Sequence, residues 1–210
     1  MKKLYNLFLL FGSLCLLASC HSNAPVTADD WFAYINDPSN GLVKVREVNG
    51  FRFEMKYLPA DYWVYREATR RKEKLSEEER ESIRQVYEGS HHFLLSIGTD
   101  GEKRQEVDIM RVGVNDYKDY SFRMHKMNFT MKESFSLKGK RHQHVPTFAN
   151  LENVYGLSPK RNLNLVFLDN EDIREASTWD IKMEDDIFHT GIHHFSFNRT
   201  QLHTIPTLTF

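Results

Sequence analysis

The stretch VKVREVNGFRFEMKY, residues 43–57, decides the fold class of this chain. β-branched and aromatic residues alternate there with charged ones on both sides of Asn49-Gly50, which is the pattern of two strands joined by a tight turn. A two-residue turn would place the valines of the first strand opposite charged residues. A loop of three residues, Val48 to Gly50, instead pairs Val45 with Phe53, and its next rung pairs Val43 with Met55. We therefore predict a β-hairpin with this three-residue loop and with both valines on the buried face.

Similar short alternations of apolar and polar residues recur along the rest of the chain, separated by turn residues. Several short strands of this kind are typical of an antiparallel sandwich or barrel. The fold class that we expect is therefore α+β, mainly antiparallel β. The further strands are expected at residues 93–97, 107–114, 129–137, 163–168, 179–183, 193–197 and 205–210.

A highly charged segment, residues 60–88, is predicted to be helical and to pack beside the sheets. Ser76 and Glu79 have the spacing of a capping box, in which each side chain bonds the backbone N–H of the other residue. The charges between Arg66 and Arg84 have mixed signs at i, i+4 spacing. We interpret this run as a solvated helical face and not as a surface that binds a partner.

Two shorter helices are expected outside this segment. Asp29 or Asp30 can cap the first one, which precedes the stop signal at Pro38. The second helix covers residues 117–126, and its apolar side chains are spaced for one buried face. That face consists of Tyr120, Met124 and Met127.

The N-terminus has the layout of a cleavable secretory signal. Lys2 and Lys3 precede an apolar run, residues 4–18, and the small residues Ala18 and Ser19 stand directly before Cys20. This run is shorter than the roughly 20 apolar residues that a transmembrane helix needs. We therefore predict that residues 1–19 are a signal peptide.

Leu17-Ala18-Ser19-Cys20 resembles the lipobox of bacterial lipoproteins, in which a leucine and two small residues precede a cysteine. The resemblance implies cleavage before Cys20, diacylation of the Cys20 thiol and acylation of the new amino group. Several acyl chains together hold a protein durably at a membrane, because each buried methylene contributes about 0.8 kcal/mol. On this reading residues 20–27 are a lipidated tether and residues 28–210 form a single β-rich globular domain. Palmitate on Cys20 would thus be the anchor.

The residues after Cys20 bear on the location of the protein. Lipoproteins kept at the inner membrane often carry Asp directly after the cysteine, whereas His21 and Ser22 stand here, so the resemblance implies an outer-membrane lipoprotein. No acidic residue occurs in residues 21–27, which favours the periplasmic face, with the cell surface as the alternative. The body also resembles uncharacterised outer-membrane lipoproteins of the Bacteroidota, in WFAYINDPSNGLVK (residues 31–44) and IPTLTF (residues 205–210), and this implies no activity.

The composition excludes several classes of protein. The chain has 28 Lys and Arg against 29 Asp and Glu, so it lacks the basic excess of a nucleic-acid-binding protein. Its two cysteines, Cys15 and Cys20, both lie near the N-terminus. We therefore expect no disulfide, thiolate nucleophile or CxxC zinc site in the folded domain.

Histidines are the candidates for metal ligands. His142 and His144 would point to the same side of an extended segment. His189 and His193 have the HxxxH spacing but lack the adjacent Glu of a zinc-protease helix, and Gly191 between them favours a turn and a strand. We predict no metal site, no cofactor and no catalytic residue, and keep these four histidines as weak candidates.

Other motifs of catalysis are absent from the sequence. It contains no GxSxG nucleophile elbow and no glycine-rich phosphate loop. Aromatic residues cluster where the first hairpin meets the charged helical segment, and such rings can bind sugars or peptides. We favour the interpretation that they join the sheet to the helices, since aromatic residues dominate core contacts. These residues are Tyr57, Tyr62, Trp63 and Tyr65.

Three hypotheses for the function follow. The leading one is a non-enzymatic, membrane-anchored lipoprotein that binds a protein or assists envelope assembly in the periplasm. The second is a metal-assisted hydrolase that uses His189 and His193 with Asp185 or His142. The third is an immunity-type lipoprotein that neutralises a toxin. No nucleic-acid partner is expected.

Overall fold

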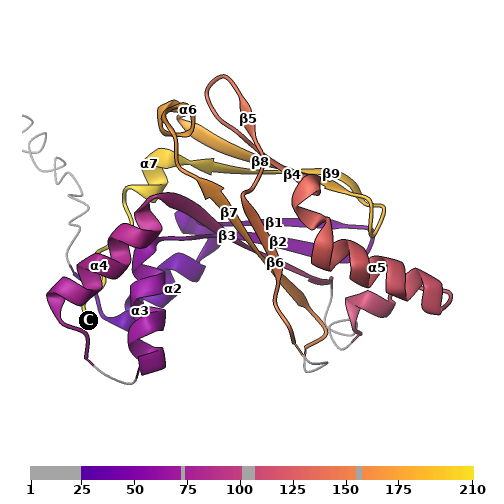
Figure 1. The fold of residues 1–210 in the computed structure, drawn as a ribbon, viewed down its shortest axis with the longest axis horizontal. Coiled ribbons are helices and arrows are strands. Elements are labelled where there is room, and N and C mark those ends of the chain that lie inside the picture. The colour runs from indigo at the N-terminus through magenta and orange to yellow at the C-terminus, as the bar shows by residue number, and fades with distance from the viewer. Residues whose placement is uncertain (1–24, 72–73, 101–106, 155–157) are drawn as a thin grey trace, which may run out of the picture.

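The structure is a computed structural model that describes residues 25–71, 74–100, 107–154 and 158–210. Two antiparallel sheets pack face to face, with helices at both ends of the sandwich (Figure 1). The predicted α+β class with mainly antiparallel strands is therefore confirmed. The first sheet has the order β1 (Val43–Val48), β2 (Phe51–Leu58), β3 (Ser90–Thr99), β7 (Arg161–Leu168) and β6 (Phe148–Leu151). The second has the order β5 (Gln143–His144), β4 (Phe135–Lys138), β8 (Thr178–Asp185) and β9 (Gly191–Asn198).

The main core lies between the two sheets. Alternate residues of each strand point inward because side chains alternate between the faces of a sheet. Large apolar side chains such as Phe53 and Phe93 in the first sheet, and Ile181 and Phe195 in the second, are fully buried. Each buried side chain of this size contributes roughly 1.5–3 kcal/mol relative to leaving it in water.

The predicted helical segment at residues 60–88 consists of two helices, α3 (Ala60–Arg71) and α4 (Glu77–Glu88). The capping box is present, because Ser76 N donates to Glu79 Oε2 over 2.8 Å and Glu79 N donates to Ser76 Oγ over 3.2 Å. Glu67 forms ion pairs with Arg70 and Arg71 at 2.7 and 2.8 Å. These pairs are the mixed-sign contacts expected on the charged face.

The segment at Val26 meets the C-terminal segment at the end of the molecule where α2, α3 and α4 lie (Figure 1). Helix α2 (Ala28–Asn36) is capped by Thr27, not by the predicted Asp29 or Asp30. Its Trp31 is fully buried and donates from Nε1 to the carbonyl of Pro206 over 3.0 Å. Within the described residues, the strand predicted at residues 205–210 is only a single parallel bridge between Val26 and Leu208, because helix α2 begins at Ala28 and takes the chain away from the C-terminal segment.

The register predicted for the first hairpin is wrong. Asn49 and Gly50 form a two-residue turn with φ values of 52° and 85°, so Val45 faces Glu54 and Val43 faces Lys56. Strand β1 is a sheet edge, where the requirement that apolar residues face the core is relaxed. Val43 is nevertheless buried, with only 4% of its surface exposed.

Two cations of β1 point toward the core in place of the valines. The Lys44 ammonium lies 5.8 Å from the centroid of the Phe197 ring, and the Arg46 guanidinium lies 5.9 Å from that of Phe195. Their long aliphatic stems cover apolar surface while the charged groups reach water at the open edge. Inward-pointing charges of this kind protect sheet edges against pairing with other chains.

Two other predicted strands differ in the structure. The segment from Val107 to Val114 contains a 3₁₀ turn, η3 (Ile109–Arg111), because Asp108 caps it by accepting from Met110 N over 3.0 Å. Phe129 ends a helix and Met131 lies in the 3₁₀ turn η4 (Met131–Ser134), so strand β4 begins only at Phe135.

Helix α5 (Tyr117–Phe129) covers the end of the sandwich opposite α2, α3 and α4 (Figure 1). The predicted buried face is confirmed, since Met127 is fully buried and Tyr120 and Met124 pack against the main core. At the other end, the short helix α6 (Glu171–Glu175) connects β7 to β8, and the short helix α7 (Arg199–Leu202) follows β9. Within the described residues, no helix combines the length and the apolar character needed to cross a membrane.

Candidate functional site

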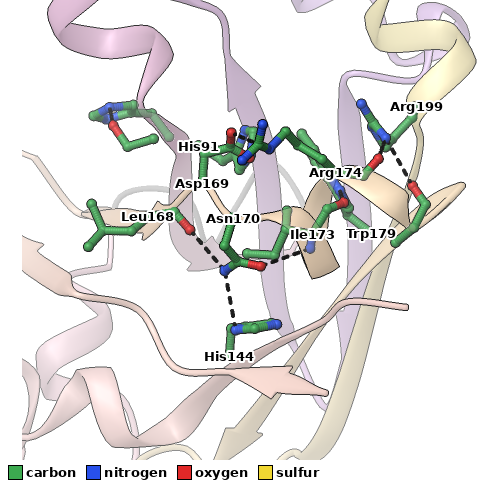
Figure 2. A network of polar contacts seen from close by, with 12 residues as sticks. His91, His144, Leu168, Asp169, Asn170, Ile173, Arg174, Trp179 and Arg199 are labelled. Carbon is green, nitrogen blue, oxygen red and sulfur yellow. Dashed lines mark hydrogen bonds and ion pairs between the residues drawn. The ribbon is translucent and has the colours of Figure 1, made fainter. Parts of the chain in front are cut away.

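A partly buried polar network joins the two sheets where β7 ends (Figure 2). The His91 Nε2 atom, from β3, lies 2.9 Å from Asp169 Oδ1, and Arg174 Nε lies 3.0 Å from Asp169 Oδ2. The His91 ring packs on Trp179 of β8, with 4.1 Å between ring centroids. Trp179 in turn donates from Nε1 to the carbonyl of Ile173 over 3.0 Å.

Burial lowers the pKa of His91, although the neighbouring Asp169 acts in the opposite direction. The imidazole is therefore neutral at neutral pH, and its Nε2–H donates to the carboxylate. A histidine oriented by a carboxylate is a frequent element of general acid–base sites. Here the same contact also fixes β3 against the end of β7.

A cavity of about 280 Å³ lies beside this network. Its wall includes Tyr57, His91, the ion pair between Asp61 and Arg84, and the C-terminal segment at Thr207. Arg84 Nη2 lies 2.9 Å from Asp61 Oδ1, and burial raises the pKa of Tyr57 to about 12. The cavity is thus a polar pocket with enough room for a small molecule.

His142 and His144, the first two candidate metal ligands, make different contacts in the structure. His144 Nε2 lies 2.8 Å from Asp172 Oδ2, while His142 is exposed and donates to the same carboxylate through its backbone N–H over 3.1 Å. The hydrogen bond between the His144 ring and the Asp172 carboxylate is the main reason that the pKa of Asp172 is lowered to about 2. The contacts dock the loop between β4 and β5 onto α6, and Gly139 permits the approach because a Cβ there would collide with the Asp172 carboxylate.

The second predicted cluster forms the loop between β8 and β9. Asp185 is 6% exposed and accepts from the backbone N–H groups of Ile187, Phe188 and Thr190 over 3.1, 3.0 and 3.0 Å. The Thr190 hydroxyl donates to Asp185 and lies 2.7 Å from His193 Nε2. All of these groups are used to hold the loop in place.

The histidines of this loop do not converge. His193 is buried against the Phe53 ring at a centroid distance of 4.7 Å, whereas His189 is exposed in the turn with φ 58°. His194 points to the outer face and contacts Asp180 over 2.7 Å. In the part of the chain that the structure describes, no group of three His, Cys, Asp or Glu side chains could hold a metal ion.

The aromatic cluster joins the helices to the first sheet, as predicted. Trp63 stacks on Tyr87 with 5.0 Å between centroids and 5° between planes, and it contacts His92 of β3 at 5.1 Å. Tyr62 and Tyr65 pack on Phe32 of α2, and Tyr57 contacts Trp179 at 5.9 Å. Burial lowers the pKa of His92 to about 4.

Some functional candidates carry no local signal in the sequence. His91 and Asp169 are 78 positions apart, and only the pairing of β3 with β7 brings them together. The signal peptide, the lipobox and Cys20 lie outside the described residues.

Comparison with known proteins identifies no family. No family model matches the chain, and no curated protein matches it. A solved structure from Burkholderia pseudomallei, described as a novel protein of unknown function, has 10% sequence identity and a TM-score of 0.40. The similarity covers 85% of this chain and 86% of that one.

Proposed function

We propose that this protein is a non-enzymatic binding lipoprotein, anchored by Cys20 in the bacterial outer membrane with its globular domain in the periplasm. The observation that carries the proposal is the sequence Leu17-Ala18-Ser19-Cys20 after a short apolar segment. Residues 20–27 would be the tether, and residues 28–210 the single domain that binds a protein or another envelope component.

The position of Val26 beside the C-terminal segment supports a tethered arrangement. Val26 N donates to the carbonyl of Thr207 over 2.9 Å, and Thr209 N donates to the carbonyl of Val26 over 2.9 Å. Val26 and Thr27 of the predicted tether are thus held by the domain, Thr27 as the N-cap of α2. A tether that reaches the domain at Pro25 leaves the molecule beside α2, α3 and α4, and the sheets and α5 extend away from that point (Figure 1). Most of the surface would remain accessible to a partner.

The polar side chains that were candidates for catalysis hold loops in place, which supports a binding role over a catalytic one. Asp185 and His193 hold the loop between β8 and β9, and His144 holds the loop between β4 and β5 onto Asp172. A catalytic metal needs about three protein ligands with one open position. The geometry of the described residues gives the metal-assisted hydrolase no such set, so we propose no second function.

Lipidation is tested by growing the expressing bacterium with an alkyne analogue of palmitate and detecting the label on the protein. The native chain should be labelled, and Cys20→Ser should lose the label and remain as the longer precursor. Cys15→Ser is the matched control and should be labelled like the native chain. Unlabelled native protein, or label that survives in Cys20→Ser, would remove the anchor from the proposal.

The non-enzymatic role is tested by metal analysis of the purified protein. We expect less than stoichiometric zinc, with no difference between the native chain and His189→Ala. Stoichiometric zinc that is lost in His189→Ala would instead support the hydrolase. A binding role further requires that crosslinking in intact envelopes yields a reproducible partner that is absent from cells expressing Cys20→Ser.

A further inference from the structure

The cavity beside the His91 network is lined by two kinds of residue. The polar part of its lining comes from the end of β2, the end of α4 and the start of β3, and it includes Tyr57, Glu88 and His91. The apolar part comes from α7 and the segment that follows it. These residues are Leu202, Ile205 and Pro206. A ligand in the cavity therefore meets both polar groups and hydrocarbon.

The Tyr57 hydroxyl is a free hydrogen-bonding group in this lining. The Tyr57 ring packs on Phe93 and Trp179 at centroid distances of 5.4 and 5.9 Å, which fixes its direction. Burial raises the pKa of Tyr57 to about 12, so the hydroxyl is protonated at neutral pH. Within the described residues this hydroxyl forms no hydrogen bond. Because buried polar groups normally have a partner, the hydroxyl is available to a ligand.

His91 supplies a second free group close to the first. Its Nε2–H donates to Asp169 over 2.9 Å (Figure 2), so Nδ1 of the neutral ring is an acceptor. In the part of the chain that the structure describes, Nδ1 has no hydrogen-bond partner. Tyr57 pairs with Phe93 across β2 and β3, and His91 stands two residues before Phe93. The side chains of Tyr57 and His91 therefore share one face of the sheet.

The charges of the lining favour a cation. Asp61 and Glu88 are the carboxylates of the lining, and Arg84 is its guanidinium. Arg84 is already held between two carboxylates, because it lies 2.9 Å from Asp61 Oδ1 and 2.5 Å from Glu81 Oε2. Glu88 forms no ion pair with any residue that the structure describes. Its negative charge is therefore left uncompensated in the cavity.

The helix ends at the cavity add to this negative potential. The C-terminal end of a helix carries roughly half a negative charge, which a basic residue in the last turn offsets. Helix α4 has no basic residue in its last turn and ends at Glu88 itself. Helix α3 begins at the same cavity, and Asp61 in its first turn offsets the positive end. The two helix ends thus leave the cavity attractive to positive charge.

We propose that this cavity binds a small alkylammonium ion, the protonated form of a primary amine. The ammonium group donates to the Glu88 carboxylate, the Tyr57 oxygen and His91 Nδ1, so each of its three N–H groups has an acceptor. The alkyl part lies against the apolar residues of the lining. The cavity volume of about 280 Å³ is at the lower end of the roughly 300–1,000 Å³ of ligand pockets, so the ligand is small. This site goes beyond the proposed function and does not depend on the lipid anchor.

The ligand class is tested by calorimetric titration of the purified full-length protein with three molecules of similar shape. n-Butylamine carries the ammonium group, n-butanol is its neutral analogue and butyrate its anionic analogue. We expect n-butylamine to bind in the micromolar to millimolar range, since few atoms make few contacts. The other two should bind roughly tenfold more weakly, because they lack the charge-assisted hydrogen bonds. Equal binding of n-butanol, preferred binding of butyrate, or no binding of n-butylamine in the millimolar range would overturn the proposal.

A free amine and the lysine side chain of a partner protein share this chemistry. Nα-acetyl-lysine amide presents the same butylammonium group on a peptide unit and is titrated in parallel. We expect n-butylamine to bind more tightly, since the small cavity has little room for the peptide unit. Tighter binding of the lysine derivative would overturn the free amine as the ligand and assign the site to a lysine of a partner.

Two variants of α4 with the same change of charge test the role of Glu88. Glu88→Gln should weaken the binding of n-butylamine by roughly fivefold, which is the usual effect of losing a partly exposed charge pair. Glu78→Gln is the matched control, because Glu78 is exposed on the same helix and does not line the cavity. Its affinity should equal that of the native chain. Equal losses in both variants would indicate non-specific attraction to α4 and would overturn the site.

Tyr57→Phe removes the free hydroxyl and keeps the ring against Phe93 and Trp179. It should weaken the binding of n-butylamine by roughly fivefold, the usual effect of losing one hydrogen bond. The free energy of unfolding without ligand should not fall, because the hydroxyl has no partner among the described residues. Unchanged affinity, whether or not the variant is destabilised, would show that the amine does not reach Tyr57 and would overturn the proposed site.

Discussion

The ring of His91 in β3 lies 4.1 Å from the ring of Trp179 in β8, and this contact links the two sheets at the end where α6 and α7 lie (Figure 2). The Arg199 guanidinium also contacts the indole, at 5.6 Å from the Trp179 ring. Burial lowers the pKa of His91 although the Asp169 carboxylate acts in the opposite direction, so the imidazole is neutral in the folded protein at neutral pH. The stability of the fold should therefore respond to acid.

Stability should fall between pH 6.5 and about 4. Burial lowers the pKa of His91, His92 and His193 below the ordinary value of 6.5, to about 4 for His92. The folded state then binds fewer protons than the unfolded state in this window, so the free energy of unfolding is highest above pH 6.5 and decreases as the pH falls. Urea melts at pH 7.5 and 4.5 measure the difference. His92→Phe keeps a ring against Trp63 and should reduce the difference in free energy of unfolding between the two pH values. Equal stability of the native chain at both pH values would contradict the lowered pKa values of these histidines.

Gly139→Ala should destabilise the protein by about 1–3 kcal/mol, the usual cost of forcing extra volume into a packed site. The added methyl group would displace the Asp172 carboxylate and loosen the loop between β4 and β5. The matched control is Gly89→Ala, because a Cβ at Gly89 meets nothing within 4 Å. Chemical denaturation compares the two variants, and equal effects would exclude the steric explanation.

Asp185→Ala should cost on the order of 3 kcal/mol, since it leaves several buried backbone N–H groups without an acceptor. The neighbouring Asp186 has a side chain that is 53% exposed and forms an ion pair with Lys126. Asp186→Ala should therefore change the free energy of unfolding by less than about 1 kcal/mol. Thermal melts of both variants check the contrast. If Asp186→Ala were the more damaging substitution, the role of Asp185 in holding the loop would be refuted.

Ser76→Ala should destabilise the protein by about 1 kcal/mol through loss of the N-cap of α4. Ser82→Ala, at an exposed position inside the same helix, should be neutral or slightly stabilising because alanine is the better helix former. Since Ser76 and Glu79 act together, the double variant with Glu79→Ala should cost less than the sum of the two single variants. Strict additivity would show that the capping box does not act as a unit.

The features that the sequence predicts correctly are local ones. The capping box at Ser76 depends on residues three positions apart, and the strand at Phe93 to Ile97 depends on period-two alternation. The register of β1 could not be predicted from parity, because at a sheet edge Lys44 and Arg46 can point inward with their charges still reaching water. The 3₁₀ turn after Asp108 was not predicted, because β-branched residues recur between Val107 and Val114 and favour a strand.

The candidate site was predictable only where its members are close in sequence. Asp185, Thr190 and His193 lie within one hairpin, and the sequence identifies the cluster but not its structural role. The contact between His91 and Asp169 spans 78 positions and depends on which strands become neighbours. A spacing rule therefore cannot find it.

The parallel bridge between Val26 and Leu208 also determines how the protein carries mechanical load. A pull applied at the N-terminus reaches this bridge and the buried Trp31 of α2 before it reaches either sheet. The bridge contributes only two backbone hydrogen bonds, so it should open first under force. The two sheets would stay folded while the terminal segment extends, because the bridge breaks at a lower force than the sheets.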